Sequence, residues 1–96
     1  MEIYGCIISI GEERQMSENF AVREVILDCS TYEQGTGRRF ENILKLQAIN
    51  SKTKLLDWFQ PGQRVKVNFY PNGRFYEKEG EQKHSQNLNL LKIEKI

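Results

Sequence analysis

The residue types that most often carry enzyme chemistry are few in this chain of 96 residues, and they are scattered. The single histidine, His84, lies in a polar stretch, and no group of His, Cys and carboxylate residues has the spacing of a metal site. Glu12 and Glu13 are adjacent in a charged segment, which is more typical of a solvated surface than of a general acid and base. Asp28 and Asp57 have no recognisable nucleophile or base beside them. We therefore expect a protein that is not an enzyme and that needs no metal and no cofactor.

Aromatic and basic side chains are better placed for chemistry, because together they can bind single-stranded nucleic acid. Bases stack on aromatic rings, a contact worth about 1–3 kcal/mol per base, while lysine and arginine side chains neutralise the phosphates. The densest segment of this kind runs from Phe69 to Lys78 and surrounds Arg74 with aromatic rings. The predicted nucleic-acid contacts are Phe20, Arg23, Arg39, Lys45, Lys66, Tyr70, Arg74, Tyr76 and Lys78.

Two of these residues have an equally plain structural interpretation. Phe20 either stacks on a base or caps the core, and the pattern favours neither. Arg23 has the same parity as Val25, which is expected to point inward, so Arg23 should lie at a rim. There it would contact a phosphate or form an internal ion pair with Asp28 or Glu24.

The other aromatic residues divide by the same alternation. Phe69 shares its row with Val67 and is expected in the core. One of Phe75 and Tyr76 should then point inward, and we expect Tyr76 to point outward because its hydroxyl tolerates water. Trp58, in a short helical segment, is expected to pack against the core.

The charge of the chain gives no indication of a polyanionic partner, since 14 basic and 13 acidic residues leave a formal net charge of +1. A nucleic-acid site must therefore depend on where the charges lie. Three glutamates, Glu77, Glu79 and Glu81, alternate with Lys78 and Lys83, so the polar segment 77–86 is nearly neutral. We expect this segment to be a loop that charge alone would not close on a phosphate backbone.

Strands are expected to position most of these side chains, because the apolar residues alternate with polar ones. Ile7 and Ile8 break the alternation near Gly5, which predicts a bulge or sharp bend in the first strand. A short helix is expected over 50–59, with Ser51 as its N-cap. The expected strands are Glu2–Ile10, Phe20–Cys29, Arg39–Ile49, Arg64–Tyr70 and Asn87–Ile96, and polar loops are expected over 11–19 and from Pro71 onward.

Five strands with a helix between the third and the fourth follow the order of the OB-fold, a small Greek-key barrel that binds oligonucleotides or oligosaccharides. An SH3-like barrel is the main competitor, but it would not be expected to carry this helix. The length is sufficient for one core and not for two. The sequence thus predicts an all-β, five-stranded OB-fold with one short helix, in a single domain that spans residues 1–96.

Motifs over nearly the whole chain resemble a small bacterial family of OB-fold domains that is common in Bacteroidetes and their phages. The motifs lie in Met1–Ile10, Arg23–Asp28, Leu55–Phe69, Gly73-Arg74 with the aromatic residues that follow, and Lys92–Ile96. That family is usually described as uncharacterised or as similar to single-stranded DNA-binding proteins. The resemblance implies an aromatic contact at Tyr76, where the family tends to carry tryptophan. The family also tends to carry tryptophan at the position of Leu91. Its loop that corresponds to 77–86 is shorter than the loop of this chain.

We therefore expect a non-catalytic module that binds single-stranded DNA, or RNA, with little sequence preference, in replication or repair. The alternative is a protein-interaction module in which Val22, Ile26 and Ile43 form a homodimer surface or bind a replication partner. Oligosaccharide binding also stays open, because a fold does not fix its ligand.

The expected location is the cytoplasm. No apolar run of 18 residues is present, and the opening segment lacks the basic and apolar parts of a signal peptide. Cys6 and Cys29 are too few for a disulfide framework and lack metal-site spacing, so both are expected to be thiols.

Overall fold

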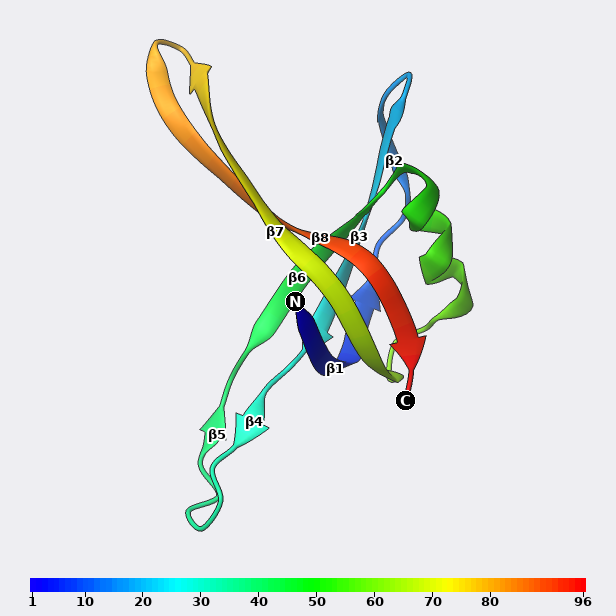
Figure 1. Ribbon diagram of the computed structural model, residues 1–96, viewed down its shortest axis with the longest axis vertical. Coiled ribbons are helices and arrows are strands. Elements are labelled where there is room, and N and C mark those ends of the chain that lie inside the picture. Colours follow the sequence, from blue (N-terminus) through cyan, green and yellow to red (C-terminus); the bar gives the residue numbers. More distant parts are fainter.

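A closed ring of five long strands forms the body of the protein in the computed structural model, which describes all residues, 1–96 (Figure 1). Three shorter strands and one helix complete it, and no helix is long and apolar enough to span a membrane. In chain order the elements are β1 (Glu2–Ile10), β2 (Arg14–Ser17), β3 (Phe20–Asp28), β4 (Thr31–Tyr32), β5 (Arg39–Phe40), β6 (Ile43–Ile49), the 3-10 helix η1 (Asn50–Trp58), β7 (Arg64–Lys78) and β8 (Glu81–Lys95).

The ring closes because β1 changes partner along its length. Residues 2–6 of β1 pair with β7 and residues 6–10 pair with β3, both antiparallel. The register between β1 and β3 shifts between Ile7 and Ser9, which confirms the predicted bulge. Around the ring the long strands run β1, β3, β6, β8, β7 and back to β1, so the predicted OB-fold order is confirmed.

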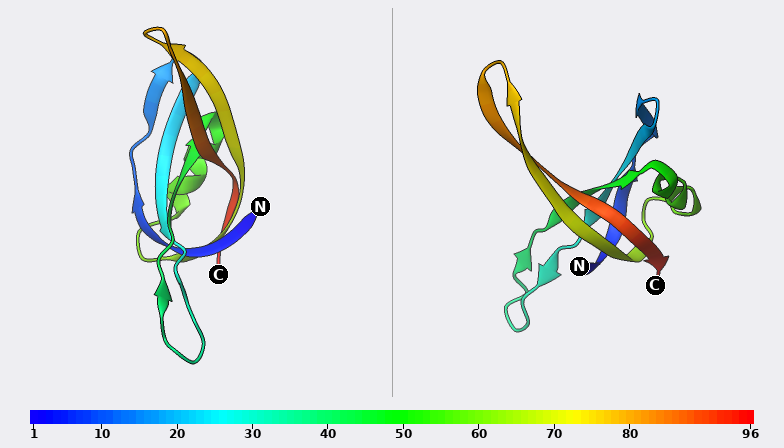
Figure 2. Two further views of the ribbon diagram at one scale, coloured as in Figure 1. Left: turned by 90° about the vertical axis from the view of Figure 1, so that its left-hand side faces the viewer. Right: turned by 45° about the horizontal axis from the view of Figure 1, so that its top comes forward.

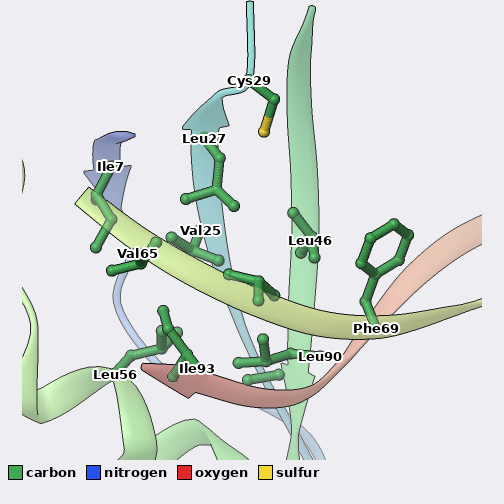
Figure 3. Packing of buried hydrophobic residues seen from close by; sticks show 12 residues of the cluster. Ile7, Val25, Leu27, Cys29, Leu46, Leu56, Val65, Phe69, Leu90 and Ile93 are labelled. Carbon is green, nitrogen blue, oxygen red and sulfur yellow. The ribbon is translucent and has the colours of Figure 1, made fainter. Parts of the chain in front are cut away.

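The core fills the inside of this ring. Alternate residues of β3, β6 and β7 point inward, as the sequence predicts for Val25, Leu27, Leu46, Ala48 and Val67. Figure 3 shows the side chains of Val25, Leu27 and Leu46 beside those of Val65 and Leu90 from other strands. The cluster comprises Ile7, Val25, Leu27, Cys29, Leu46, Ala48, Leu56, Val65, Val67, Phe69, Leu90 and Ile93.

The helix η1 closes one end of the ring, but it differs from the prediction in type and cap. It is a 3-10 helix, its N-cap position is Ile49, and no side chain caps it, so the assignment of Ser51 was wrong. Its buried residues are Thr53 and Leu56, three apart, as the three-residue turn of a 3-10 helix requires. Trp58 is 77% exposed, so its predicted packing against the core was also wrong.

The third predicted strand is interrupted. Only β6 joins the ring, whereas Arg39 lies in β5, which pairs with β4 in a separate two-stranded ribbon. The break lies at Asn42, whose carbonyl accepts from the Cys29 amide at 2.8 Å and whose amide donates to the Ser30 hydroxyl at 2.9 Å. These bonds turn the chain back toward the end of β3 before the alternation of β6 begins.

The prediction of a turn at Pro71–Gly73 and a loop over 77–86 was wrong. β7 and β8 pair without interruption from Tyr70 and Asn89 out to Lys78 and Glu81. The turn consists of Glu79 and Gly80, both with positive φ, which is the pattern of a type I′ hairpin turn. We call residues 70–89 the arm.

The segment 11–19 was likewise predicted as a loop, but its residues Arg14–Ser17 form β2 and pair with β3. The arm and the β2–β3 hairpin therefore project from one end of the molecule and diverge, while the β4–β5 ribbon projects from the other end (Figures 1 and 2). The molecule is elongated, with extents of 51 × 33 × 20 Å.

Candidate nucleic-acid interface

The pleat of the arm sorts its side chains onto two faces. Phe69 is buried and points inward, and no register shift follows it in β7, so Tyr70 and every second residue after it point to the opposite, outer side. On β8 the residues directly opposite them share that side. We call this the outer arm face; its aromatic and charged residues are Tyr70, Arg74, Tyr76, Lys78, Glu81 and Lys83.

Basic residues dominate the outer arm face. Its three cations, Arg74, Lys78 and Lys83, form none of the ion pairs in the structure, and Glu81 is the single carboxylate among them. Glu77 lies on the other face of the arm, because it alternates with Tyr76 and Lys78. The segment 77–86, which is nearly neutral by composition, therefore places two cations and one carboxylate on this face. With Arg74, the outer arm face carries three positive charges and one negative charge.

The two aromatic residues next to Arg74 point to opposite sides. Tyr76 is 41% exposed on the outer arm face, as expected from the sequence. Phe75 is 69% exposed on the other face, where its ring lies 5.2 Å from the ring of His84. The expectation that one of the two would be inside the protein was wrong, because the arm extends beyond the core.

A hydrogen bond joins the outer arm face to the body of the protein. The Gln47 amide of β6 donates to the Asn89 side-chain oxygen of β8 at 3.0 Å, and Asn89 lies opposite Tyr70. Gln47 and Asn89 are also the single register pair between β6 and β8. Since Leu46 and Ala48 are buried inside, Gln47 marks the outer side of β6, and the outer side is continuous from β6 to the arm.

The outer side of β3 and β6 carries a mixture of charged and apolar residues. Glu24 accepts from Arg14 at 2.8 Å and pairs with Lys45 at 3.1 Å, so two cations share one carboxylate. Ile43 is exposed beside them and Ile26 is half-buried. Val22 is only 5% exposed, so the apolar surface proposed for a partner is smaller than the sequence suggests.

Phe20 and Arg39 lie at the two ends of this outer side. Phe20, at the start of β3, is partly exposed and does not belong to the core cluster, so it does not cap the core. Arg39 donates to the Ser30 hydroxyl at 3.1 Å and lies 3.4 Å from Asp28, at the far end of β3. The Ser30 hydroxyl and amide, and after them Arg39, hold the pKa of Asp28 below its ordinary value.

Arg23 lies away from the outer side. Its guanidinium pairs with Asp57 of η1 at 2.6 Å and donates to the Gly11 and Thr53 carbonyls at 2.8 and 3.3 Å. The predicted position at the rim and the internal ion pair are both present, but the predicted partners, Asp28 and Glu24, were wrong. With its side chain 19% exposed, Arg23 links the β1–β2 connection to the helix.

Lys66 lies in the row of β7 that continues to Tyr70, but it lies on the ring and not on the arm. It projects from the ring between β1 and β8, opposite Tyr4 on one side and Glu94 on the other. Its ammonium is 3.9 Å from Glu2 and 3.8 Å from Glu94, so two carboxylates surround it. The strand β8 lies between β7, which carries Lys66, and β6, which carries Lys45.

Two cations of the outer side were missed by the sequence prediction. Lys83 was assigned to a loop tip, where side chains do not alternate between two faces as they do in a strand. Arg14 was assigned to a loop before β3. Both lie in strands of polar residues without an apolar row, so hydrophobic alternation did not mark them. The alternation of Glu with Lys over 77–83 was the one available signal.

The model of one protein family, described as a domain of unknown function (DUF3127), matches residues 2–94. The chain belongs to the DUF3127 family. A comparison with the sequences of curated proteins finds no match.

Solved structures similar to this DUF3127 chain include the protein PriB from Ralstonia solanacearum, with a TM-score of 0.69 and 11% identity over 100% of this chain and 96% of that one. The single-stranded DNA-binding protein from Thermus aquaticus matches with a TM-score of 0.77 and 18% identity, over 99% of this chain and 48% of that one. The chain thus spans about half the length of the Thermus protein. These similarities confirm the all-β OB-fold and the expected likeness to single-stranded DNA-binding proteins; at such identities they show the fold alone.

Proposed function

We propose that residues 1–96 act as one non-catalytic OB-fold module that binds single-stranded DNA. The observation that carries the proposal is the outer arm face, where Tyr70 and Tyr76 alternate with three cations that have no carboxylate partner. The Gln47–Asn89 hydrogen bond joins this face to the outer side of β3 and β6. A nucleic-acid strand needs this combination of aromatic faces and cations along one path.

The proposed strand runs from the arm across β6 toward β5. Tyr70 and Tyr76 stack on bases, while Arg74, Lys78 and Lys83 neutralise phosphates on the arm. Lys45 and Arg39 continue the path along the body, and Phe20 offers a further ring at the start of β3. Every base has a face to stack, so this mode of binding implies little sequence preference.

Arg23 and Lys66, both predicted contacts, lie off this path, and we assign them no contact with the strand. The ion pair of Arg23 with Asp57 and the two carboxylates near Lys66 give both cations a role within the protein. A role in replication or repair stays a prediction.

Fluorescence anisotropy with a labelled oligo-dT strand at low salt tests the proposal. We expect Tyr76→Ala to weaken binding about fivefold or more, since a stacked base contributes about 1–3 kcal/mol. Phe75→Ala is the matched control, because it removes an exposed ring from the other face of the same arm. It should leave affinity within about twofold of the wild type.

Two results would contradict the proposal: no binding of oligo-dT at tens of micromolar protein, or equal losses in the two variants. The same titration with an oligo-U strand compares RNA with DNA.

The alternative, a protein-interaction module, depends on the exposed apolar residues of the outer side. Ile43 supports it, but Val22 is already covered within the chain, which leaves a smaller apolar surface for a partner. Light scattering tests for a homodimer. A stable dimer that Ile43→Lys dissociates would favour this alternative.

A further inference from the structure

A small open cavity lies on the outside of the ring, beside the β4–β5 ribbon. This ribbon leaves the body at one end of the molecule (Figure 1). The volume of the cavity is about 180 Å³. Its walls come from four parts of the chain that are distant in sequence: β1, the end of β3, the β4–β5 ribbon and the start of β7. Six of the lining residues have charged, hydroxyl or aromatic side chains: Tyr4, Asp28, Ser30, Tyr32, Arg39 and Arg64.

The change of partner along β1 creates this cavity. Cys6 is the register partner of Arg64 on one side and of Asp28 on the other. Arg64 and Asp28 therefore lie on strands to either side of β1, about 10 Å apart at the backbone. The space between them lies over Cys6, and the β4–β5 ribbon, with Tyr32 opposite Arg39, closes one side.

Positive charge dominates the cavity. Arg64 makes no ion pair and no side-chain hydrogen bond in the structure. Arg39 lies 3.4 Å from Asp28 and 3.7 Å from Glu41, longer than the roughly 2.7–2.9 Å of a strong charged hydrogen bond. Two guanidinium groups thus share the lining with one carboxylate, that of Asp28, which favours an anionic ligand.

Two exposed tyrosine rings complete the cavity. Tyr4 and Tyr32 are both exposed, and neither hydroxyl makes a hydrogen bond within the protein. Arginine with exposed aromatic rings is the combination that binds a phosphate together with its base. A nucleotide is itself about drug-sized, and the volume is below the roughly 300 Å³ at which pockets for such ligands begin, so the open cavity encloses part of one nucleotide and leaves the rest in solvent.

We propose that this cavity binds a single nucleotide, with its phosphate between Arg39 and Arg64 and its base against the tyrosine rings. The proposal rests on the proposed function for the source of the nucleotide, a unit of the bound strand beyond Arg39. The chemistry of the cavity does not depend on the arm, so the two can be tested separately.

The test is a titration of the full chain with dTMP, followed by amide NMR shifts. Thymidine is the matched ligand without phosphate, and inorganic phosphate is the ligand without base. We expect dTMP to shift the amides of Cys6, Ser30 and Arg64 to saturation, and each partial ligand to bind at least about tenfold more weakly.

Arg64→Gln should weaken dTMP binding at least about tenfold, since a charged hydrogen bond to phosphate is lost. Tyr32→Ala, on the ribbon outside the core, is a second variant with the same expected direction. The control is Arg38→Gln, which removes the same charge from the same ribbon. Its guanidinium lies over the Phe40 ring at 5.3 Å and does not line the cavity.

No shift of these amides with dTMP, or equal effects of the two arginine variants, would overturn the proposal. Inorganic phosphate that binds as tightly as dTMP would overturn the assignment of the tyrosine rings. If oligo-dT binds but dTMP does not shift the amides of the cavity, the cavity proposal fails and the proposed function stands. If dTMP binds in the cavity but oligo-dT does not bind, the proposed function fails and the cavity stands.

Discussion

Ser30 fixes the end of β3 through both its amide and its hydroxyl. The amide donates to the Asp28 carboxylate at 3.0 Å, while the hydroxyl oxygen accepts from the Asn42 amide at 2.9 Å and from Arg39 at 3.1 Å. The Ser30 hydroxyl makes the largest contribution to the lowered pKa of Asp28, followed by the Ser30 amide, with Arg39 contributing less. Asp28 therefore stays ionised to a lower pH than an ordinary aspartate.

We predict that Ser30→Ala raises the pKa of Asp28 toward the ordinary value of 3.8. A depressed folded-state pKa stabilises the protein above the unfolded-state pKa, and this stabilisation is lost as the pH falls through the folded-state value. The variant should therefore lose less stability on acidification than the wild type. Carboxyl NMR titration measures the pKa, with Ser51→Ala, on the exposed side of η1, as control. An unchanged Asp28 midpoint in Ser30→Ala would show that the hydroxyl is not the cause.

At this scale the sequence predicts the direction of a side chain better than its partner. Alternation correctly placed Leu46 and Ala48 inside and Arg23 at a rim, because parity is a local property of a strand. The partner of Arg23 is Asp57, 34 positions along the chain, and the two meet only because η1 packs over one end of the ring. The nearer carboxylates that the sequence suggested point elsewhere.

The helix that covers one end of the ring, η1, depends on residues spaced by three. Leu56 is fully buried and belongs to the core cluster, whereas its neighbour Leu55 is 37% exposed. Thr53, one turn earlier, donates to the Asn50 carbonyl at 2.8 Å and lies against the carboxylate of Glu13. The short turn of a 3-10 helix directs Thr53 and Leu56 into the end of the ring.

We predict that Leu56→Ala lowers the free energy of unfolding by about 2–4 kcal/mol, because it leaves a cavity in the core. Leu55→Ala makes the same chemical change one residue away and should cost less than about 1 kcal/mol. Urea unfolding followed by circular dichroism gives both values. Similar losses in the two variants would mean that both leucines pack on the core, as an α-helix would place them.

The elements that the sequence missed are those that have no core to cover. The five ring strands carry apolar rows, and four of them were predicted to begin within a few residues of their observed starts. The arm and β2 consist of polar residues exposed on both faces, so neither could be recognised by alternation. Pro71 reinforced the error, since proline suggests a turn. Past Phe69, whose amide and carbonyl both bond to Met1, β7 has only β8 beside it, and a strand with one free edge can accommodate proline.

At the scale of the whole molecule, the ring provides stability and the projecting ribbons provide charge. A two-stranded ribbon alone is only marginally stable, but both strands of the arm continue directly into the ring and are held there. The strand order of the ring was predictable from the sequence, whereas the reach of the arm was not. The net charge is only +1, so any polyanion is attracted by the local cations of the outer arm face rather than by the whole protein.

This distribution predicts how DNA binding should depend on salt. Each phosphate neutralised on a single strand contributes about −0.7 to the slope of log K against log salt concentration, so the three arm cations give about −2. Lys83→Gln should make the slope less negative by about 0.7. The control is Lys54→Gln, which removes a lysine of η1, away from the arm. Lys54 pairs with Glu13 at 3.4 Å, and its removal should leave the slope unchanged. Anisotropy titrations of oligo-dT over a series of salt concentrations measure both slopes. If the two variants shift the slope equally, overall charge governs binding and the outer arm face is not the contact surface.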